Sequence, residues 1–213
     1  SLSHEQFVKL QQASAKQTVE GLVMGALIRN NVKLERADAL LAYSRTMMIE
    51  QLNRKVNAVA KELATILAND GIDYRIFKGQ TLALLYPHPE TRMPGDIDFY
   101  CVPNHFARAQ QLLQKAWGIT LGGEESMQHR DFSYKDVPLE MHFCMMKFNS
   151  NAIQTYWERL LAEASIEQVS IEGVAVNTLP STLNVLYTFL HLYHHLVELG
   201  VGLRQFCDLL VLL

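Results

Sequence analysis

The chain has 213 residues, of which 49% are hydrophobic, and its formal net charge at pH 7 is −3. A chain of this length and composition can bury a sizeable core, which excludes an intrinsically disordered protein. The weakly acidic balance provides no broad basic surface for extended nucleic acid, although it leaves room for a local basic pocket.

The expected cellular setting follows from the cysteines and from the absence of long apolar runs. Cys101, Cys144 and Cys207 are scattered, odd in number and without CxxC spacing, which predicts reduced thiols in a cytoplasmic protein. No apolar run reaches the roughly 20 residues of a membrane span, and the opening SLSHEQFVKLQQ is too polar for a signal peptide. The final FCDLLVLL stops inside an apolar helical pattern without a capping residue, so we expect the chain to continue past residue 213.

From about residue 4 to residue 70 the pattern is helical. Two long segments are separated near RNNVKLER, where Asn30 and Asn31 suit a helix end. The second segment places apolar residues at spacings of three, four or seven and ends at NDG, residues 69–71. This part predicts an N-terminal helical segment that packs on a core.

The periodicity changes after residue 71. YRIF (74–77) and DIDFYCV (96–102) read as strands, GQTLALLY (79–86) as a short helix, and NHFARAQQLLQKAW (104–117) as a helix capped by Asn104. Two hairpins follow, turning at Lys135 and Asp136 and at Glu172 and Gly173, with a helix at 150–164 between them.

From Ser181 onward, two further helices are joined by Gly200 and Gly202. The predicted fold class is therefore α/β (α+β), a mixed sheet flanked by helices. We expect three parts, with an N-terminal helical segment at 1–70, the α/β core at 71–180 and C-terminal helices at 181–213.

The stretch RMPGDIDFYCVP carries two carboxylates, Asp96 and Asp98, in an otherwise apolar strand. Residues i and i+2 of a strand point to the same side, so the two carboxylates project together, with backbones less than about 7 Å apart. Like charges at this distance repel, and a divalent cation such as magnesium removes the repulsion. The alternative is an edge strand on which both aspartates face water.

A glycine turn precedes this strand by about eighteen residues. In FKGQT, Gly79 and the amides of Gln80 and Thr81 lie at the expected start of a helix, where backbone N–H groups favour a phosphate. Lys78 adds a positive charge at the same place.

A third carboxylate follows in the later strand VPLEMHF. There Glu140 and His142 alternate with apolar residues, so they share a face. His142 could orient the carboxylate or touch substrate, and a packed structural histidine is the alternative.

A glycine turn, an aspartate pair and a later strand acid, in this order, resemble the nucleotidyltransferase superfamily that includes DNA polymerase beta. More closely, FKGQTLALLYPHPETRMPGDIDFYCVP, LEMHF, HLYHHL and GLRQFCDLL are similar to a bacterial family of uncharacterised nucleotidyltransferases. The resemblance covers roughly residues 55–210.

The resemblance implies a metal-dependent transfer of a nucleoside monophosphate from a nucleoside triphosphate, such as ATP, to a hydroxyl or amine acceptor. Asp96, Asp98 and Glu140 would bind Mg²⁺ or Mn²⁺, and the acceptor is a small molecule or a protein. Gly79 and the residues after it would hold the triphosphate, but the usual Gly-Ser of this turn is Lys-Gly here. A catalytically inactive binding or regulatory module of the same fold is the alternative function.

The remaining candidates are cationic and histidine side chains. Lys78 and Arg92 would neutralise phosphate charge, and the alternative for Arg92 is a solvated loop arginine. Arg204 and Asp208, four residues apart, would close one side of the pocket or form an ordinary helix ion pair.

His191 is a further pocket candidate. It also lies four residues before His195, which is zinc-ligand spacing on a helix. A zinc hydrolase built on this pair is a third reading, although it lacks the glutamate that follows the first histidine in zinc peptidases.

Overall fold

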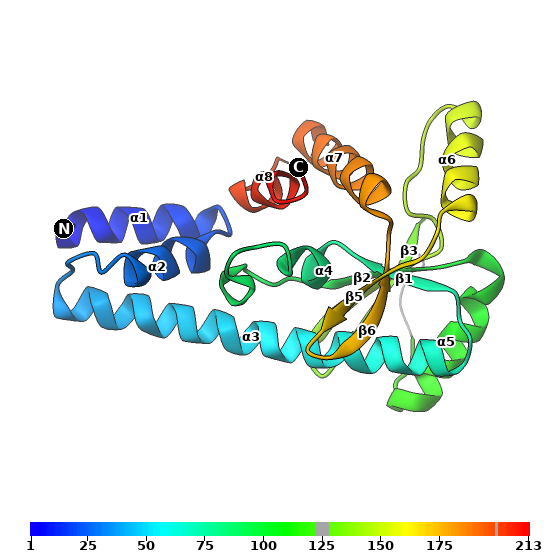
Figure 1. Ribbon diagram of the computed structural model, residues 1–213, viewed down its shortest axis with the longest axis horizontal. Helices are drawn as coiled ribbons and strands as arrows, with labels where there is room; N and C mark the ends of the chain where they lie inside the picture. The colour runs from blue at the N-terminus through cyan, green and yellow to red at the C-terminus, as the bar shows by residue number, and fades with distance from the viewer. Residues whose placement is uncertain (122–127, 199) are drawn as a thin grey trace. The chain divides into compact units, whose positions relative to one another are not determined.

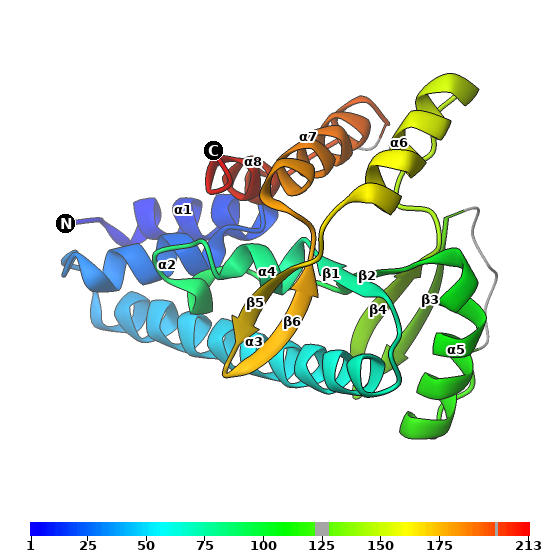
Figure 2. The same ribbon diagram turned by 45° about the vertical axis from the view of Figure 1, so that its right-hand side comes forward.

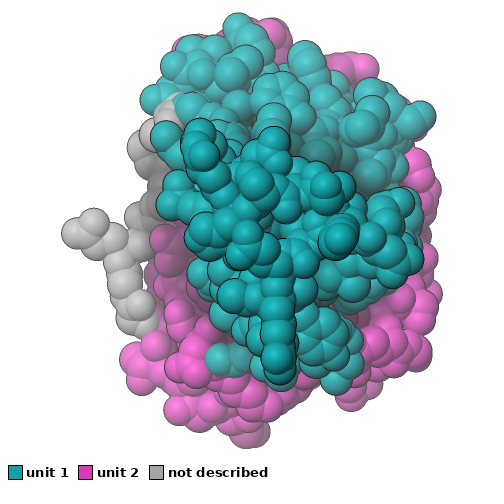
Figure 3. Space-filling model, turned by 90° about the vertical axis from the view of Figure 1, so that its left-hand side faces the viewer, with its two compact units in different colours: residues 1–55, 82–94, 185–213 teal, residues 56–81, 95–184 magenta. Residues whose placement is uncertain are grey.

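The computed structural model of the protein describes residues 1–121, 128–198 and 200–213. The chain folds into two compact units, which Figure 3 colours separately. Unit 1 comprises Ser1–Lys55, Leu82–Pro94 and Val185–Leu213, and unit 2 comprises Val56–Thr81 and Gly95–Asn184. Across the described residues, no helix combines the length and apolar character needed to cross a membrane.

Unit 2 is built on a four-stranded mixed sheet (Figure 2). Its strands are β1 (Tyr74–Phe77), β2 (Ile97–Cys101), β3 (His129–Tyr134) and β4 (Val137–His142), in the order β1-β2-β4-β3. The neighbours β2 and β4 are parallel, and the other two pairs are antiparallel. The mixed sheet predicted from the sequence is thus confirmed.

The two faces of this sheet differ in polarity because side chains alternate along each strand. One face carries Ile76, Phe99 and Met141, which are fully buried in a core. That core also receives apolar residues from α5 (Pro103–Trp117) and from the later part of α3 (Arg36–Asn69). The opposite face carries the polar residues of β2 and β4, which leaves it available for chemistry.

Helix α5 lies beside the sheet in both ribbon views (Figures 1 and 2) and buries Phe106, Ala109, Leu113 and Trp117 along one side. It begins at Pro103, so the predicted cap at Asn104 is wrong. Asn104 is the second helical residue, and Val102 occupies the cap position without a side-chain hydrogen bond. Proline suits the first helical position because its ring fixes φ and its missing N–H would have no intrahelical partner there.

Both predicted hairpin turns are confirmed. Lys135 and Asp136 join β3 to β4 with φ of 50° and 53°, and Glu172 and Gly173 join β5 (Glu167–Ile171) to β6 (Val174–Thr178) with φ of 46° and 85°. Positive φ at both central residues matches the right-handed twist of the strands. The turn at Lys135 and Asp136 fixes the register of β3 against β4.

Helix α6 (Asn151–Glu163) lies in unit 2 at the predicted place. Its N-cap is Ser150, whose hydroxyl accepts a hydrogen bond from the Ile153 N–H. The short helix α4 (Gly79–Ala83) follows β1 and has five residues, so it is shorter than the predicted 79–86.

Unit 1 is helical. It contains α1 (His4–Lys16), α2 (Glu20–Arg29), the first part of α3, the 3-10 turn η1 (Pro89–Thr91), most of α7 (Ser181–Glu198) and α8 (Leu203–Leu210). The first long helical segment predicted from the sequence is therefore two helices. The break falls at Thr18, whose φ of 55° cannot continue a right-handed helix.

The loop that leads into β2 is held tightly within unit 1. The buried Asn53 amide donates hydrogen bonds to the carbonyls of Glu90 and Arg92 at 3.0 and 2.8 Å. Helix α2 approaches the same loop so closely that a Cβ on Gly21 would overlap the Thr91 carbonyl oxygen. These contacts fix the path of residues 90–92 within unit 1.

Candidate metal and nucleotide site

Three carboxylates from unit 2 meet on the polar face of the sheet. The parallel register of β2 and β4 places Asp98 opposite Glu140, and Asp96 immediately precedes β2. One carboxylate oxygen from each of the three lies within 4.8 Å of the others. Strand β2 is an inner strand and Asp98 is buried, so the alternative of an edge strand with both aspartates in water is excluded.

Two cationic or polarisable groups contact the buried carboxylate. The Lys78 ammonium lies 3.0 Å from Oδ1 of Asp98, and Nε2 of His142 lies 3.2 Å from the same oxygen. Nε2 of His142 also lies 3.3 Å from Oε2 of Glu140. The histidine therefore bridges two members of the acidic triad, which we define as Asp96, Asp98 and Glu140.

These contacts set the charge of Asp98 and His142. Burial would raise the pKa of Asp98, but Lys78 and His142 outweigh burial and hold this pKa well below its usual range. Burial would lower the pKa of His142, but its hydrogen bonds to Asp98 and Glu140 outweigh burial and raise it. Asp98 is thus a firmly ionised, buried anion.

The pKa of Asp96 is shifted in the opposite direction to that of Asp98. Burial and then the negative charges of Asp98 and Glu140 raise its pKa, with Lys78 opposing them in part. The triad therefore holds more negative charge than its surroundings compensate. Hard carboxylate oxygens gathered this closely suit Mg²⁺ or Mn²⁺, so the residues present fit a divalent cation.

The predicted glycine turn lies directly against the aspartates. Lys78 and Gly79 both have left-handed backbone, with φ of 56° and 40°. A Cβ on Gly79 would lie 3.2 Å from the backbone oxygen of Asp96, so glycine permits both the conformation and the close approach. The turn brings the Lys78 ammonium onto the triad.

The two residues after the glycine have buried side chains. The Gln80 amide donates a hydrogen bond to Asn57, and the Thr81 hydroxyl donates one to the Lys78 carbonyl at 2.8 Å. If the Thr81 hydroxyl replaced the missing serine hydroxyl of the usual Gly-Ser turn in binding phosphate, this local bond would have to change. Nucleotide binding by Gln80 and Thr81 stays a prediction.

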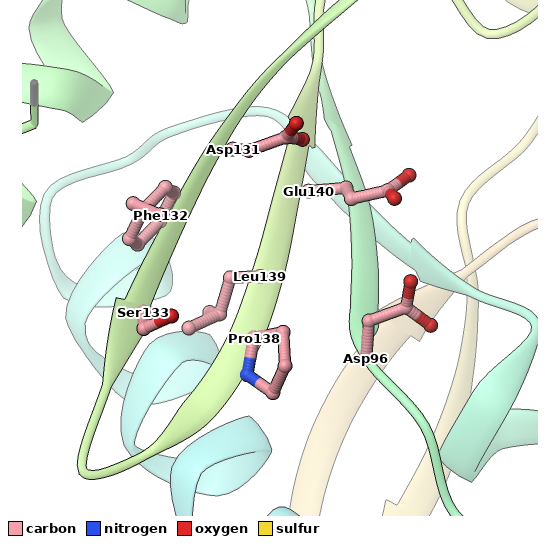
Figure 4. Close-up of a pocket in the computed structure, with 7 residues that line it drawn as sticks. All are labelled: Asp96, Asp131, Phe132, Ser133, Pro138, Leu139 and Glu140. Carbon is pink, nitrogen blue, oxygen red and sulfur yellow. The ribbon is translucent and has the colours of Figure 1, made fainter. Parts of the chain in front are cut away.

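A cavity of about 230 Å³ adjoins the triad (Figure 4). Two members of the triad line it: Asp96, which immediately precedes β2, and Glu140 on β4. The remaining lining residues come from the β3–β4 hairpin and are Asp131, Phe132, Ser133, Pro138 and Leu139. This volume is below the roughly 300–1,000 Å³ of pockets that enclose a drug-sized ligand, so the cavity is too small to enclose such a ligand whole.

Arg92 and Asp208, two other predicted site residues, are partners within unit 1. Nε and Nη2 of Arg92 donate to the two carboxylate oxygens of Asp208 at 2.7 and 2.8 Å, and the Tyr86 hydroxyl donates to Oδ1 at 2.7 Å. Arg92 is buried, so the alternative of a solvated loop arginine is excluded. A role for Arg92 and Asp208 in binding phosphate stays a prediction.

The last predicted pocket residues, Arg204 and His191, also belong to unit 1. Arg204 donates to the Met93 carbonyl at 3.2 Å. His191 lies between the rings of Tyr187 and His195, at 6.0 and 4.2 Å between centroids. Among the described residues, neither His191 nor His195 belongs to a group of three side chains placed to hold a metal ion.

Sequence reasoning missed His129 and Asp131, which lie beside the triad. The register of β3 and β4 pairs Asp131 with Glu140 and His129 with His142. The predicted two-residue turn already implied these pairs, because counting outward from Lys135 and Asp136 gives the same register. The signal was therefore present in the sequence.

Comparison with solved structures shows the class of fold. The chain is similar to the antibiotic-resistance factor ANT(2'')-Ia, with a TM-score of 0.53, 12% identity, and coverage of 75% of this chain and 82% of that chain. It is also similar to an antigenic nucleotidyltransferase-like protein from Paracoccidioides brasiliensis, with a TM-score of 0.49, 18% identity and 74% of each chain covered. The chain therefore shares its fold with ANT(2'')-Ia.

The family model described as "uncharacterised nucleotidyltransferase" matches residues 3–213. The chain belongs to this family, and the resemblance noted from the sequence is confirmed. No curated protein matches the sequence. Membership of this family supports a nucleotidyl-transfer function.

Proposed function

We propose that the protein is a metal-dependent nucleotidyltransferase that moves a nucleoside monophosphate from a nucleoside triphosphate to a hydroxyl or amine acceptor. The observation that carries the proposal is the acidic triad, in which two inner strands bring Asp98 and Glu140 into register beside Asp96. Its uncompensated negative charge calls for a divalent cation, and Mg²⁺ is the first candidate.

Asp96, Asp98 and Glu140 would hold the cation, which when bound would polarise the phosphate and orient the attacking and leaving oxygens. Lys78 would contribute a positive charge toward the triphosphate, since the left-handed turn at Gly79 places its ammonium at the triad. His142 bridges Asp98 and Glu140, so it fixes the direction of both carboxylates.

The reaction is an in-line displacement at the α-phosphorus. A bond forms between the acceptor oxygen or nitrogen and the α-phosphorus, and the bond from this phosphorus to the bridging oxygen breaks. Pyrophosphate leaves, and the acceptor proton passes to a carboxylate. We choose Glu140 for this role because its side chain is 31% exposed, whereas that of Asp98 is 4% exposed. The acceptor would be a small molecule or a protein.

A second function of the same fold is a binding module without catalysis. The observation that favours it is the Thr81 hydroxyl, which is buried and donates to the Lys78 carbonyl. A turn that offers no hydroxyl group to the phosphates could still bind a nucleotide without catalysing the transfer.

The test is a binding titration of each nucleoside triphosphate, ATP first, with and without Mg²⁺. It uses the wild type, Asp96→Asn, Asp98→Asn and the control Asp136→Asn, which changes an exposed acid in the β3–β4 turn. We expect Mg²⁺-dependent binding in the wild type and the control, and its loss in both triad variants. Circular dichroism checks folding, because Asp98→Asn leaves Lys78 and His142 without their carboxylate.

Equal binding by Asp96→Asn and the wild type would refute the site. Absence of binding by the folded wild type at millimolar triphosphate would refute the proposed function itself. Binding followed by release of pyrophosphate in the presence of cell-extract small molecules favours the transferase. Binding without turnover in any acceptor mixture favours the module.

A further inference from the structure

A second group of histidine and carboxylate side chains, close enough together to hold a metal ion, shares Glu140 with the acidic triad. Hairpin β3–β4 pairs His129 with His142 and Asp131 with Glu140. Residues directly opposite each other on an antiparallel pair share a face. Two imidazoles and two carboxylates therefore form one block on the polar face of the sheet.

The distances within this block suit a single cation. The imidazole rings of His129 and His142 lie 4.8 Å apart between centroids. One ring nitrogen from each histidine and one carboxylate oxygen of Glu140 all lie within 4.8 Å of one another. Nε2 of His129 also lies 3.1 Å from Oδ1 of Asp131, in the manner of the carboxylates that orient metal-binding histidines.

An independent observation concerns the second nitrogen of His142. The side chain is 5% exposed, and its Nδ1 is buried with no hydrogen-bond partner among the described residues. Buried polar atoms almost always have partners, and each exception asks for an explanation such as an ion. Nε2 of His142 faces the carboxylates of Asp98 and Glu140, so Nδ1 is the ring nitrogen without a protein partner among the described residues. An imidazole nitrogen is a common metal ligand.

We propose that His129, His142 and Glu140 form a binding site for a transition-metal cation, with Zn²⁺ as its representative. Two imidazole nitrogens and one carboxylate are ligands typical of zinc, whereas magnesium prefers oxygen alone. Three protein ligands leave a fourth position open, as in zinc sites that accept water or substrate. This site differs from the all-oxygen triad, which suits Mg²⁺.

Sharing Glu140 makes the two sites antagonistic. A Zn²⁺ ion held by both histidines takes this carboxylate away from Asp96 and Asp98, so zinc lowers the affinity of the triad for Mg²⁺ and nucleotide. This consequence rests on the proposed function, whereas zinc binding itself does not.

The experiment is a Zn²⁺ titration of the chelator-treated full chain against a chromophoric zinc indicator, without nucleotide. It compares the wild type with His129→Gln, with Asp96→Asn, and with the control His4→Gln, which alters a separate group formed by His4, Glu35 and Asp38. We expect the wild type, His4→Gln and Asp96→Asn to bind one zinc with equal affinity. His129→Gln should lower the zinc affinity at least about 100-fold, because even residues that only orient metal ligands contribute about 10- to 100-fold to metal affinity.

Equal zinc affinity in His129→Gln and the wild type would overturn the site, as would the absence of zinc binding by the folded wild type at 100-fold excess over protein. If only His4→Gln lost zinc affinity, the zinc would be bound by the group that contains His4, and the proposed site would be overturned too. Circular dichroism of His129→Gln confirms its fold, and His129 is partly exposed on β3, so the substitution leaves the core intact.

Two further measurements separate this inference from the proposed function. His129→Gln keeps Mg²⁺-dependent nucleotide binding, because His129 takes no part in the triad. Glu140→Gln weakens zinc binding and Mg²⁺-dependent nucleotide binding together, and unchanged zinc affinity in this variant would overturn the sharing of Glu140. Failure of nucleotide binding with zinc binding retained would refute the proposed function and leave the zinc site standing.

Discussion

Replacement of Asp96 by asparagine should make the protein more stable while abolishing its response to Mg²⁺. Each pair of carboxylates in the triad has oxygens within 4.8 Å, where two unit charges repel by about 3 kcal/mol at an effective dielectric constant near 20. Lys78 offsets part of this repulsion, and Asp96 is only half-buried, so we expect a net gain of about 1 kcal/mol in the free energy of unfolding at pH 7.

The pH dependence of this gain follows from the raised pKa of Asp96. A carboxyl whose pKa is higher in the folded state binds more protons there, so stability falls as pH rises from the unfolded pKa, about 3.9, through the folded pKa. The wild type therefore carries a penalty above this window and none below it. The advantage of Asp96→Asn should be complete at pH 7 and vanish below pH of about 4.

The assay is urea unfolding followed by circular dichroism, at several pH values and with or without Mg²⁺. Magnesium at ten times its dissociation constant should stabilise the wild type by about 1.4 kcal/mol and leave Asp96→Asn unchanged. The reasoning is refuted if Asp96→Asn is the less stable protein at pH 7, or if magnesium stabilises both proteins equally.

Three further variants or probes test the folded core. Asp208→Asn leaves Arg92 buried without its counter-charge, so urea unfolding should show a loss of about 3–5 kcal/mol, and a loss below 1 kcal/mol would contradict a buried ion pair. Gly21→Ala would normally stabilise a helix by about 1 kcal/mol, but the new Cβ would overlap the Thr91 carbonyl oxygen, so a net loss in thermal midpoint is expected and a gain would disprove the contact. Cys101 is fully buried and burial raises its pKa, so iodoacetamide should label the other two cysteines first and reach Cys101 only in denaturant.

The strands and turns of unit 2 could be predicted because their signals are local. The alternation of apolar and polar residues indicated β2 and β4, and the two-residue turn at Lys135 and Asp136 predicted the pairing of β3 with β4. The acidic triad was predicted through these elements and the resemblance. The parallel pairing of Asp98 with Glu140 joins residues more than forty positions apart, and no local pattern specifies such a register.

Other features were beyond sequence reasoning for the same physical reason. The ion pair of Arg92 with Asp208 spans 116 positions, and each residue alone is compatible with a solvent-exposed role. The break at Thr18 depends on a left-handed residue that is neither glycine nor asparagine, so composition gave no warning. The start of α5, by contrast, could have been predicted correctly, because proline favours the first helical position and Pro103 occupies it.

The register of β2 against β4 has one more consequence. Asp98 and Glu140 are spaced by main-chain hydrogen bonds between two inner strands, and not by the side chains that fill the core on the far face. Substitutions among those core side chains can therefore lower the melting temperature without altering the spacing of the carboxylates. Cation binding should then persist at full affinity up to the temperature at which the strands separate, so that loss of the ion and loss of the fold occur in one transition.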